Sequence, residues 1–167
     1  WRVALKHHGP VALVLTRQNL PTINREIFED AEALLQGAYV LADMGDDDPE
    51  LILMASGSEV QLILQAAMKL AAEGVNVRVV SFPSWELFEA QDLSYRDQVL
   101  PPSIKKRLAV EAGVPFGWER WVGDHGRIIG IEKFGASAPG DILMQNYGFT
   151  VDHVIKAAMN LIKSDLF

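Results

Sequence analysis

Arg17 is the residue whose type and position point most directly to binding chemistry. It lies in a polar loop, residues 16–21, which follows the apolar run 11–15 and ends at Pro21. An unbroken apolar run of this length predicts a strand buried on both faces, and open α/β sheets commonly place ligand-binding residues just after such strands. A guanidinium can hold a phosphate through two parallel hydrogen bonds. A surface arginine paired with a nearby carboxylate fits the same pattern equally well, so both interpretations stay open.

A second candidate is the turn at residues 56–59, SGSE, which separates a predicted strand from a predicted helix. Backbone N–H groups at the start of such a helix can hold an anion. The turn lacks both GxGxxG and GxxxxGK[ST], the glycine patterns that bind phosphates. Ser58 and Gln61 have the spacing of a capping box, and Gly57 permits the turn. Because capping alone explains these residues, we favour a structural role.

A third candidate is the glycine-rich segment 132–140, EKFGASAPG, which follows the last predicted strand. Open α/β sheets bind ligands in this position. A tight connection of small residues, with Pro139 in the first turn of the next helix, explains the same composition.

Residues for covalent or metal chemistry are missing or wrongly spaced. The chain has no cysteine, and the acidic run 46–48 lacks the spaced glycine and terminal glutamate of a calcium loop. No pair of histidines has metal-binding spacing with a carboxylate partner; the histidines are His7, His8, His125 and His153. We therefore predict no catalytic residue, no cofactor-binding residue and no metal ligand in this chain.

The charge balance limits the partners of the chain. The formal net charge is -7 and the pI is about 5.0. Nucleic-acid backbones and anionic lipid surfaces attract clustered lysine and arginine, so we expect neither a nucleic-acid nor a membrane partner. No apolar run approaches the roughly 20 residues of a membrane span, and we expect a cytoplasmic protein.

Strand and helix patterns alternate along most of the chain. Apolar runs predict strands at 37–42, 51–55, 77–82, 107–110 and 127–131. Helical spacing and turn residues predict helices at 59–73, 84–90, 94–99, 117–122, 139–147 and 150–163.

This alternation predicts an α/β fold: a three-layer sandwich with a mixed, mostly parallel five-stranded sheet. Four of the strands are expected to be parallel. No helix separates segment 37–42 from strand 51–55, so segment 37–42 should pair antiparallel. The apolar run 11–15 precedes a linker and is expected to belong to a preceding domain.

The beginning of the chain supports that expectation. It opens with Trp1 in an apolar helical run that Gly9 and Pro10 end. A helix that starts in this way suggests that the polypeptide is part of something longer.

Several segments together resemble the transketolase family. Residues 15–21, LTRQNLP, resemble its LSRQNLP segment, with Thr16 in place of serine, and residues 55–60, ASGSEV, resemble its A[ST]GSEV segment. Later family segments match in the same order, at 79–83 (VVSFP), 95–101 and 134–137 (FGAS). The resemblance covers essentially the whole chain.

The resemblance implies the fold of the third transketolase domain for residues 37–167, a linker at 22–36, and the tail of the preceding pyrimidine-binding domain at 1–21. Transketolases transfer two-carbon ketol units between sugar phosphates, using thiamine diphosphate and a divalent metal, Mg or Ca. In the family, the arginine that matches Arg17 is a substrate-phosphate ligand. The family's metal-binding motif, activating glutamate and other substrate ligands match nothing in this chain.

The resemblance therefore implies a non-catalytic C-terminal part of a transketolase, inactive alone. Its expected partners are the missing domains of its own chain, a second copy in a homodimer, and sugar phosphates. Two alternatives remain open. One is an independent regulatory module that binds a small ligand through the 56–59 turn or the 135–140 loop. The other is the same domain of a related thiamine enzyme, such as dihydroxyacetone synthase or a dehydrogenase E1 subunit.

Overall fold

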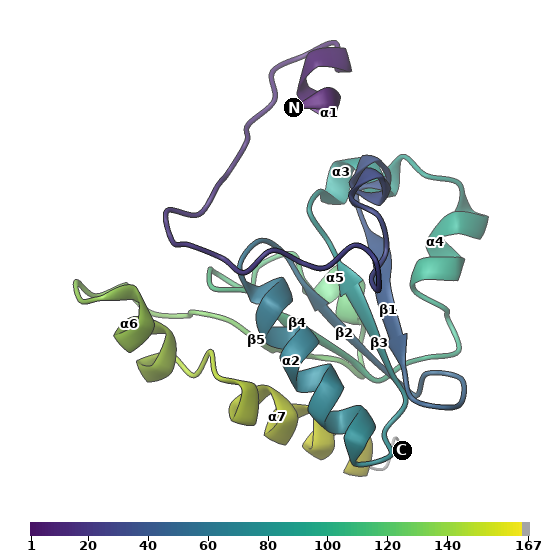
Figure 1. Cartoon of the computed structure of the whole chain (residues 1–167), viewed down its shortest axis with the longest axis vertical. Coiled ribbons are helices and arrows are strands. Elements are labelled where there is room, and N and C mark those ends of the chain that lie inside the picture. Colours follow the sequence, from purple (N-terminus) through teal and green to yellow (C-terminus); the bar gives the residue numbers. More distant parts are fainter. Residues whose placement is uncertain (165–167) are drawn as a thin grey trace.

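The structure, a computed structural model, describes residues 1–164 of the 167-residue chain (Figure 1). The strands are β1 (Tyr39–Met44), β2 (Leu51–Ala55), β3 (Val77–Ser81), β4 (Arg107–Val110) and β5 (Arg127–Ile129). The helices are α1 (Arg2–Lys6), the 3-10 helix η1 (Ala31–Gln36), α2 (Glu59–Ala72), α3 (Trp85–Glu89), α4 (Leu93–Val99), α5 (Glu119–Val122), α6 (Gly140–Asn146) and α7 (Val151–Lys163).

The five strands form one sheet in the order β1-β3-β2-β4-β5. Strands β2 to β5 run parallel, and β1 pairs antiparallel with β3. The predicted fold class is therefore confirmed, as is the antiparallel orientation of the first strand. Only a short turn around Gly45 connects β1 to β2, so the chain reverses direction there, and β3, which runs parallel to β2, lies antiparallel to β1.

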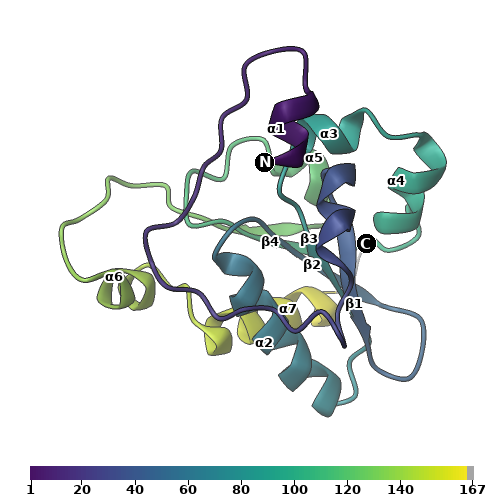
Figure 2. The same ribbon diagram turned by 45° about the horizontal axis from the view of Figure 1, so that its top comes forward.

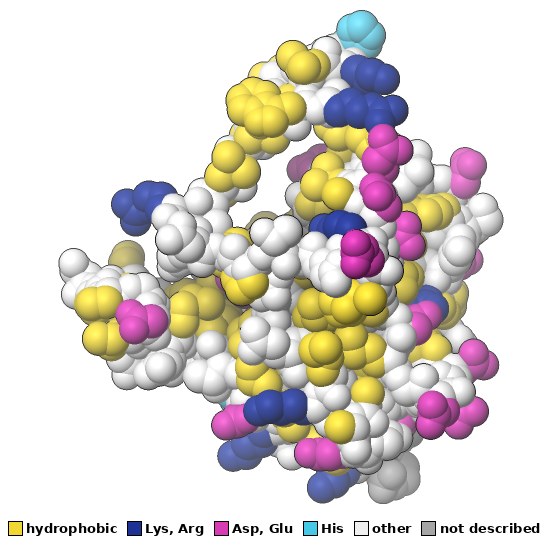
Figure 3. All heavy atoms as spheres, viewed as in Figure 1, with side chains coloured by type: hydrophobic (Ala, Val, Ile, Leu, Met, Phe, Trp, Pro, Cys, Tyr) yellow, Lys and Arg dark blue, Asp and Glu magenta, His cyan; other side chains and the backbone are white. Residues whose placement is uncertain are grey.

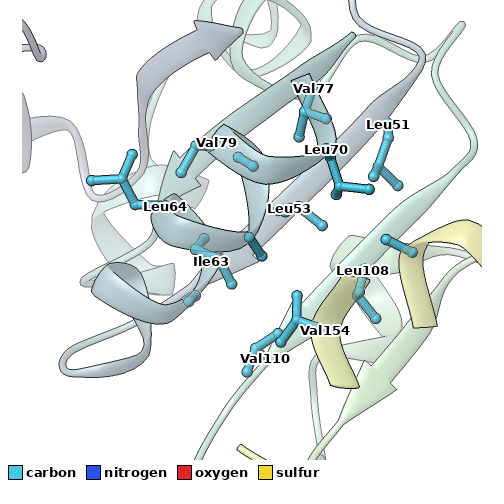
Figure 4. Close-up of a cluster of buried hydrophobic side chains, with 14 of the residues drawn as sticks. Leu51, Leu53, Ile63, Leu64, Leu70, Val77, Val79, Leu108, Val110 and Val154 are labelled. Atoms are coloured by element: carbon cyan, nitrogen blue, oxygen red, sulfur yellow. The ribbon is translucent and has the colours of Figure 1, made fainter. Parts of the chain in front are cut away.

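Successive side chains of a strand point to opposite faces of the sheet, and the buried strand β2 supplies both cores. Leu51 and Leu53 belong to the core under α2 and α7, where they lie with residues such as Ile63 of α2 and Val154 of α7 (Figure 4). Ile52 belongs to the core on the other face. The two helix layers thus bury both faces of the sheet.

The second core contains a cluster of aromatic rings, and α3 and α5 lie on this side (Figure 2). The Phe82 ring contacts Phe88 and Trp118 edge to face at centroid distances of 5.0 Å and 5.6 Å. Edge-to-face aromatic pairs are favourable beyond the area that they bury. The aromatic core therefore fixes the short helices against the sheet.

Residues 1–22 form an arm that extends from this body and contains α1 (Figure 1). The predicted strand at 11–15 is absent, and Val14 and Leu15 are 94% and 77% exposed. Figure 3 shows hydrophobic side chains along the arm. The prediction was wrong for the described chain because a strand needs a neighbour to bond its backbone, and no described strand lies beside this run.

Glycine explains two element boundaries. Gly37 has a φ of 85° at the end of η1, where a Cβ atom would lie 2.3 Å from the Phe88 backbone nitrogen, so β1 starts at Tyr39 instead of residue 37. Gly74, with a φ of 84°, follows the end of α2 as predicted.

The remaining helices lie close to their predicted ranges, and Thr150 caps α7 by accepting from the His153 backbone N–H at 3.3 Å. Helix α6 has no buried residue. Within residues 1–164, no helix has the length and apolar character needed to cross a membrane.

Candidate functional site

The carboxyl ends of β2 and β4 form the candidate site. The chain leaves β2 for β3 on one side of it and later returns to β4 on the other side. Open α/β sheets bind ligands where the strand order reverses in this way. Ala55 and Val110, the last residues of β2 and β4, are paired in register. The segments after them, 56–59 and 111–113, are therefore brought together.

Glu59 is the buried centre of this edge, with 4% of its surface exposed. Its carboxylate accepts a hydrogen bond from the Ser58 hydroxyl and another, at 3.2 Å, from the Ala112 backbone N–H. Glu59 thus links the start of α2 to the segment after β4.

Glu111 lies beside this network and accepts a hydrogen bond from the Ser56 hydroxyl at 2.9 Å. Burial raises the pKa of the Glu59 carboxyl above its ordinary value of 4.5, and the nearby charge of Glu111 acts in the same direction. The hydrogen bonds from Ser58 and Ala112 oppose these effects. The edge therefore favours a protonated Glu59 more than water does.

The expected capping box at 58–61 is absent. Ser58 already has helical backbone angles, and its side chain caps no backbone N–H. Its hydroxyl donates to Glu59, and the Gln61 amide donates to the Pro21 carbonyl at 3.0 Å. The capping prediction was wrong because a capping serine needs extended backbone angles for its oxygen to accept a hydrogen bond from a backbone N–H of the first turn, and Ser58 is already helical.

The arrangement disfavours an anionic ligand at this turn. A phosphate at the start of α2 would meet the carboxyl groups of Glu59 and Glu111, and like charges repel strongly where water is excluded. An adjoining pocket of about 450 Å³ includes the hydroxyls of Ser56 and Ser84 and the Trp85 ring. Carboxylates, hydroxyls and an aromatic wall suit a neutral or cationic organic molecule better than a phosphate.

Arg17 lies away from this edge. It is exposed in the arm, and its side chain forms no hydrogen bond or ion pair with residues 1–164. Its neighbour Gln18 reaches Gly140, where a Cβ atom would lie 2.8 Å from the Gln18 amide nitrogen. The loop containing Arg17 thus lies near the start of α6.

The glycine-rich segment 132–139 is exposed throughout, and Phe134 is 98% exposed. The Tyr147 hydroxyl donates to the Phe134 carbonyl at 2.9 Å, and Lys133 lies over the Tyr147 ring. These contacts hold the segment against the end of α6.

The histidines lie in different places: His7 and His8 follow α1, His125 lies in a turn before β5, and His153 lies on α7. The acidic run 46–48 is exposed between β1 and β2. Within residues 1–164, no three His, Asp or Glu residues are grouped so as to hold a metal ion.

Sequence reasoning missed Glu111 and the buried position of Glu59. Glu111 is the first residue after the buried strand β4, and Glu59 is the fourth residue after the buried strand β2. A charged residue in that position is a usable signal for an edge cluster, but burial depends on which strands become neighbours.

Comparison with known proteins assigns the family. The model of the transketolase-like TK C-terminal domain matches residues 37–150. The chain belongs to this family. A Geobacillus stearothermophilus protein named transketolase is 51% identical over 163 residues, which is 97% of this chain and 24% of that protein.

Solved transketolases share the fold. The Campylobacter jejuni transketolase has 33% identity and a TM-score of 0.81, covering 96% of this chain and 24% of that one. A Pichia stipitis transketolase in complex with sedoheptulose-7-phosphate has 31% identity and a TM-score of 0.75, covering 87% of this chain and 20% of that one. This transketolase-like chain therefore spans about a quarter of the length of the curated relative.

Proposed function

We propose that this chain is the C-terminal, non-catalytic part of a transketolase, a thiamine-diphosphate enzyme that transfers two-carbon ketol units between sugar phosphates. The observation that carries the proposal is the 51% identity with the Geobacillus stearothermophilus transketolase over 97% of the chain. The sugar-phosphate substrate class is supported by the sedoheptulose-7-phosphate complex of the Pichia stipitis relative. In this proposal the chain is a cytoplasmic protein of the pentose phosphate pathway.

The residues that the structure describes do not fit a thiamine-diphosphate and metal site. Residues 1–164 contain no group of three potential metal ligands from His, Asp and Glu. The acidic groups at the carboxyl edge of the sheet also oppose a diphosphate. In our proposal, thiamine diphosphate and its Mg or Ca ion bind to polypeptide outside this chain.

The structural role is to pack against the rest of the enzyme and to support a homodimer. We propose that residues 1–21 are the tail of a pyrimidine-binding domain, 22–36 a linker, and 37–167 the C-terminal domain. The exposed apolar side chains of the arm support this division, because an apolar surface of this kind is normally covered by protein. The exposed Phe134 and the unburied helix α6 offer a second part of the same contact face.

Arg17 is the one substrate residue that we propose. In the intact enzyme, with the run 11–15 paired in its sheet, its guanidinium would bind the phosphate of the sugar substrate. Its exposure in the arm leaves it available for such a contact.

A chimera tests the proposed function. The region of the Geobacillus stearothermophilus transketolase that matches this chain is replaced by residues 1–167, and ketol transfer between xylulose 5-phosphate and ribose 5-phosphate is measured. We expect an active dimer, whereas the isolated chain shows neither transfer nor saturable binding of thiamine diphosphate. Circular dichroism and cofactor binding verify that the chimera is folded. A folded, cofactor-loaded chimera without transfer activity would contradict the proposal.

The carboxyl-edge pocket supports a second candidate function, a regulatory module for a small neutral or cationic ligand. Calorimetry of the isolated chain with polyols and with small organic amines separates the two functions. Saturable binding that disappears in Glu111→Gln would favour the regulatory module.

A further inference from the structure

Strand β5 has one open edge. It is the last strand in the sheet order, and residues 1–164 place no strand on its outer side. The Glu111 backbone N–H donates to the Ile129 carbonyl, and the Ile131 backbone N–H donates to the Gly113 carbonyl, so residues 129 and 131 face β4. Because alternate residues of a strand direct their backbone groups to opposite sides, Ile128 and Gly130 present theirs outward.

A groove of about 710 Å³ runs beside this edge. One wall is the segment 127–133, and another is α7 with His153 and Asn160. Buried apolar residues, Ile129 and Leu161, line part of the groove. The groove therefore combines apolar surface with a row of backbone hydrogen-bonding groups.

Cationic side chains lie at both ends of the wall formed by segment 127–133. Arg127 begins the segment and Lys133 ends it, and both are exposed. Glu119 and Glu132 also line the groove, but neither forms an ion pair with Arg127 or Lys133. Within residues 1–164 Arg127 has no ion pair, and the Lys133 ammonium lies over the Tyr147 ring without a carboxylate partner, so both cations can pair with carboxylates of a partner.

We propose that the outer edge of β5 binds an extended acidic peptide segment of another protein, which adds a strand to the sheet. The backbone groups of Ile128 and Gly130 would pair with the peptide backbone, and Arg127 and Lys133 would pair with carboxylates at its two ends. Strand addition of this kind draws its affinity from the main chain and its specificity from the side chains. This surface is separate from the carboxyl edge of the sheet, and its binding does not depend on transketolase activity.

A blocked heptapeptide of alternating valine and threonine, with a glutamate at each end, tests the proposal. Its length matches the segment 127–133, and its symmetric sequence allows either strand direction. The peptide is titrated into the 167-residue chain while amide NMR signals are followed. We expect saturable shifts and slower hydrogen exchange at Ile128 and Gly130. The charge reversals Arg127→Glu and Lys133→Glu should each weaken binding about three- to tenfold, and Lys6→Glu, on the distant arm, should have no effect.

Two modified peptides complete the design. In the first, lysine replaces both glutamates; it should bind more weakly to the unmodified chain and more tightly to the Arg127→Glu and Lys133→Glu double variant. In the second, alternate amides are N-methylated along one edge or the other, and one of the two versions should lose binding. Equal binding of both methylated versions, or no saturable shift up to millimolar peptide, would overturn the proposal. If Arg127 and Lys133 serve only to keep two copies of the chain from pairing along this edge, the unmodified chain should bind no peptide. The double variant should then self-associate, which sedimentation measures, and this outcome would also overturn the proposal.

Discussion

Glu59 makes the stability of the domain depend on pH. Its carboxyl is buried beside Glu111, and its pKa is raised in the fold above the ordinary value of 4.5. A group with a raised folded pKa contributes stability that is fully present below the unfolded pKa and is lost as pH rises through the folded pKa. Folding therefore stabilises the protonated form of Glu59 relative to its carboxylate form.

The substitution Glu59→Gln should flatten this dependence. A glutamine keeps an oxygen for the Ala112 N–H and carries no charge, so its stability relative to the unmodified chain should increase from about pH 4 to pH 8. The gain is about 1.4 kcal/mol for each unit by which the folded pKa exceeds the unfolded value. Urea unfolding across this range measures it, with Glu73→Gln on the surface as the control. If the free energy of unfolding changes with pH in the same way for Glu59→Gln and for the unmodified chain, Glu59 does not titrate in this range.

Arg107 connects three segments through one guanidinium. It donates to the backbone carbonyls of Ile104, Leu100, Pro101 and Trp121 at 2.9 to 3.1 Å. Burial lowers the pKa of its guanidinium, because the charged group has lost part of its hydration. Part of the hydrogen-bond energy therefore offsets the cost of removing this hydration.

Replacing Arg107 by methionine should lower the free energy of unfolding by about 2–4 kcal/mol, because several half-buried carbonyls lose their donor. Chemical denaturation followed by tryptophan fluorescence measures the change. Lys105→Met, on an exposed neighbour, is the matched control and should change stability by less than about 0.5 kcal/mol. A similar small change for both variants would mean that water replaces the guanidinium without loss.

Arg17 offers a prediction at the level of the intact enzyme. A charge-assisted hydrogen bond contributes about 1.5–3 kcal/mol, so Arg17→Ala in the chimera should lower kcat/KM for phosphorylated sugars roughly 10- to 150-fold. Non-phosphorylated acceptors should be nearly unaffected, because they carry no phosphate. If both classes of acceptor lose equally, Arg17 holds its loop and does not bind phosphate.

At the scale of elements, the body has strands that are hydrogen-bonded to neighbouring strands, and the arm has none within the described residues. Strand β2 is bonded to β3 and β4, whereas the run 11–15 has no neighbouring strand. Backbone amides without structural hydrogen bonds exchange quickly with solvent.

Deleting residues 1–21 should therefore change the urea midpoint very little, and in the unmodified chain residues 11–15 should exchange far faster than residues 51–55. Deletion of 1–36 is the matched comparison: it also removes Ile23 and Phe28, which contact the core under α2, and should destabilise the domain. Equal protection of 11–15 and 51–55 in a dilute monomer would contradict this prediction.

The elements that sequence predicted well are those whose pattern is local. Helix α7 is an example, since its apolar spacing and Thr150 define it without reference to the rest of the chain. The run 11–15 has an equally clear strand pattern, but a strand also needs a partner, which no local pattern supplies. The Ser58 cap also looked clear locally, but Ser58 is already helical in the structure, and Glu59 is bonded to Ala112 only because β4 lies beside β2. The carboxyl-edge cluster thus depends on strand order, which the sequence does not state.

At the scale of the whole molecule, the chain is an α/β body from which an arm extends (Figure 1). Apolar side chains are exposed on the arm, on the loop around Phe134 and on α6. Exposed apolar surface is costly for a protein that works alone and ordinary for one part of a larger assembly. The match to about a quarter of the transketolase relative agrees with that physical description. Fold and family follow from this chain, whereas its part in catalysis belongs to our proposal.

The packing of α7 has a consequence for synthesis on the ribosome. Val154, Ala158 and Leu161 of α7 complete the core that β2, α2 and β4 begin, although α7 is made after all the other described elements. While the chain grows, Leu108 and Val110 therefore stay uncovered on that face until α7 emerges. A chain released before α7 would expose this apolar surface to chaperones and proteases, so the last described helix determines when the newly made domain becomes safe from aggregation.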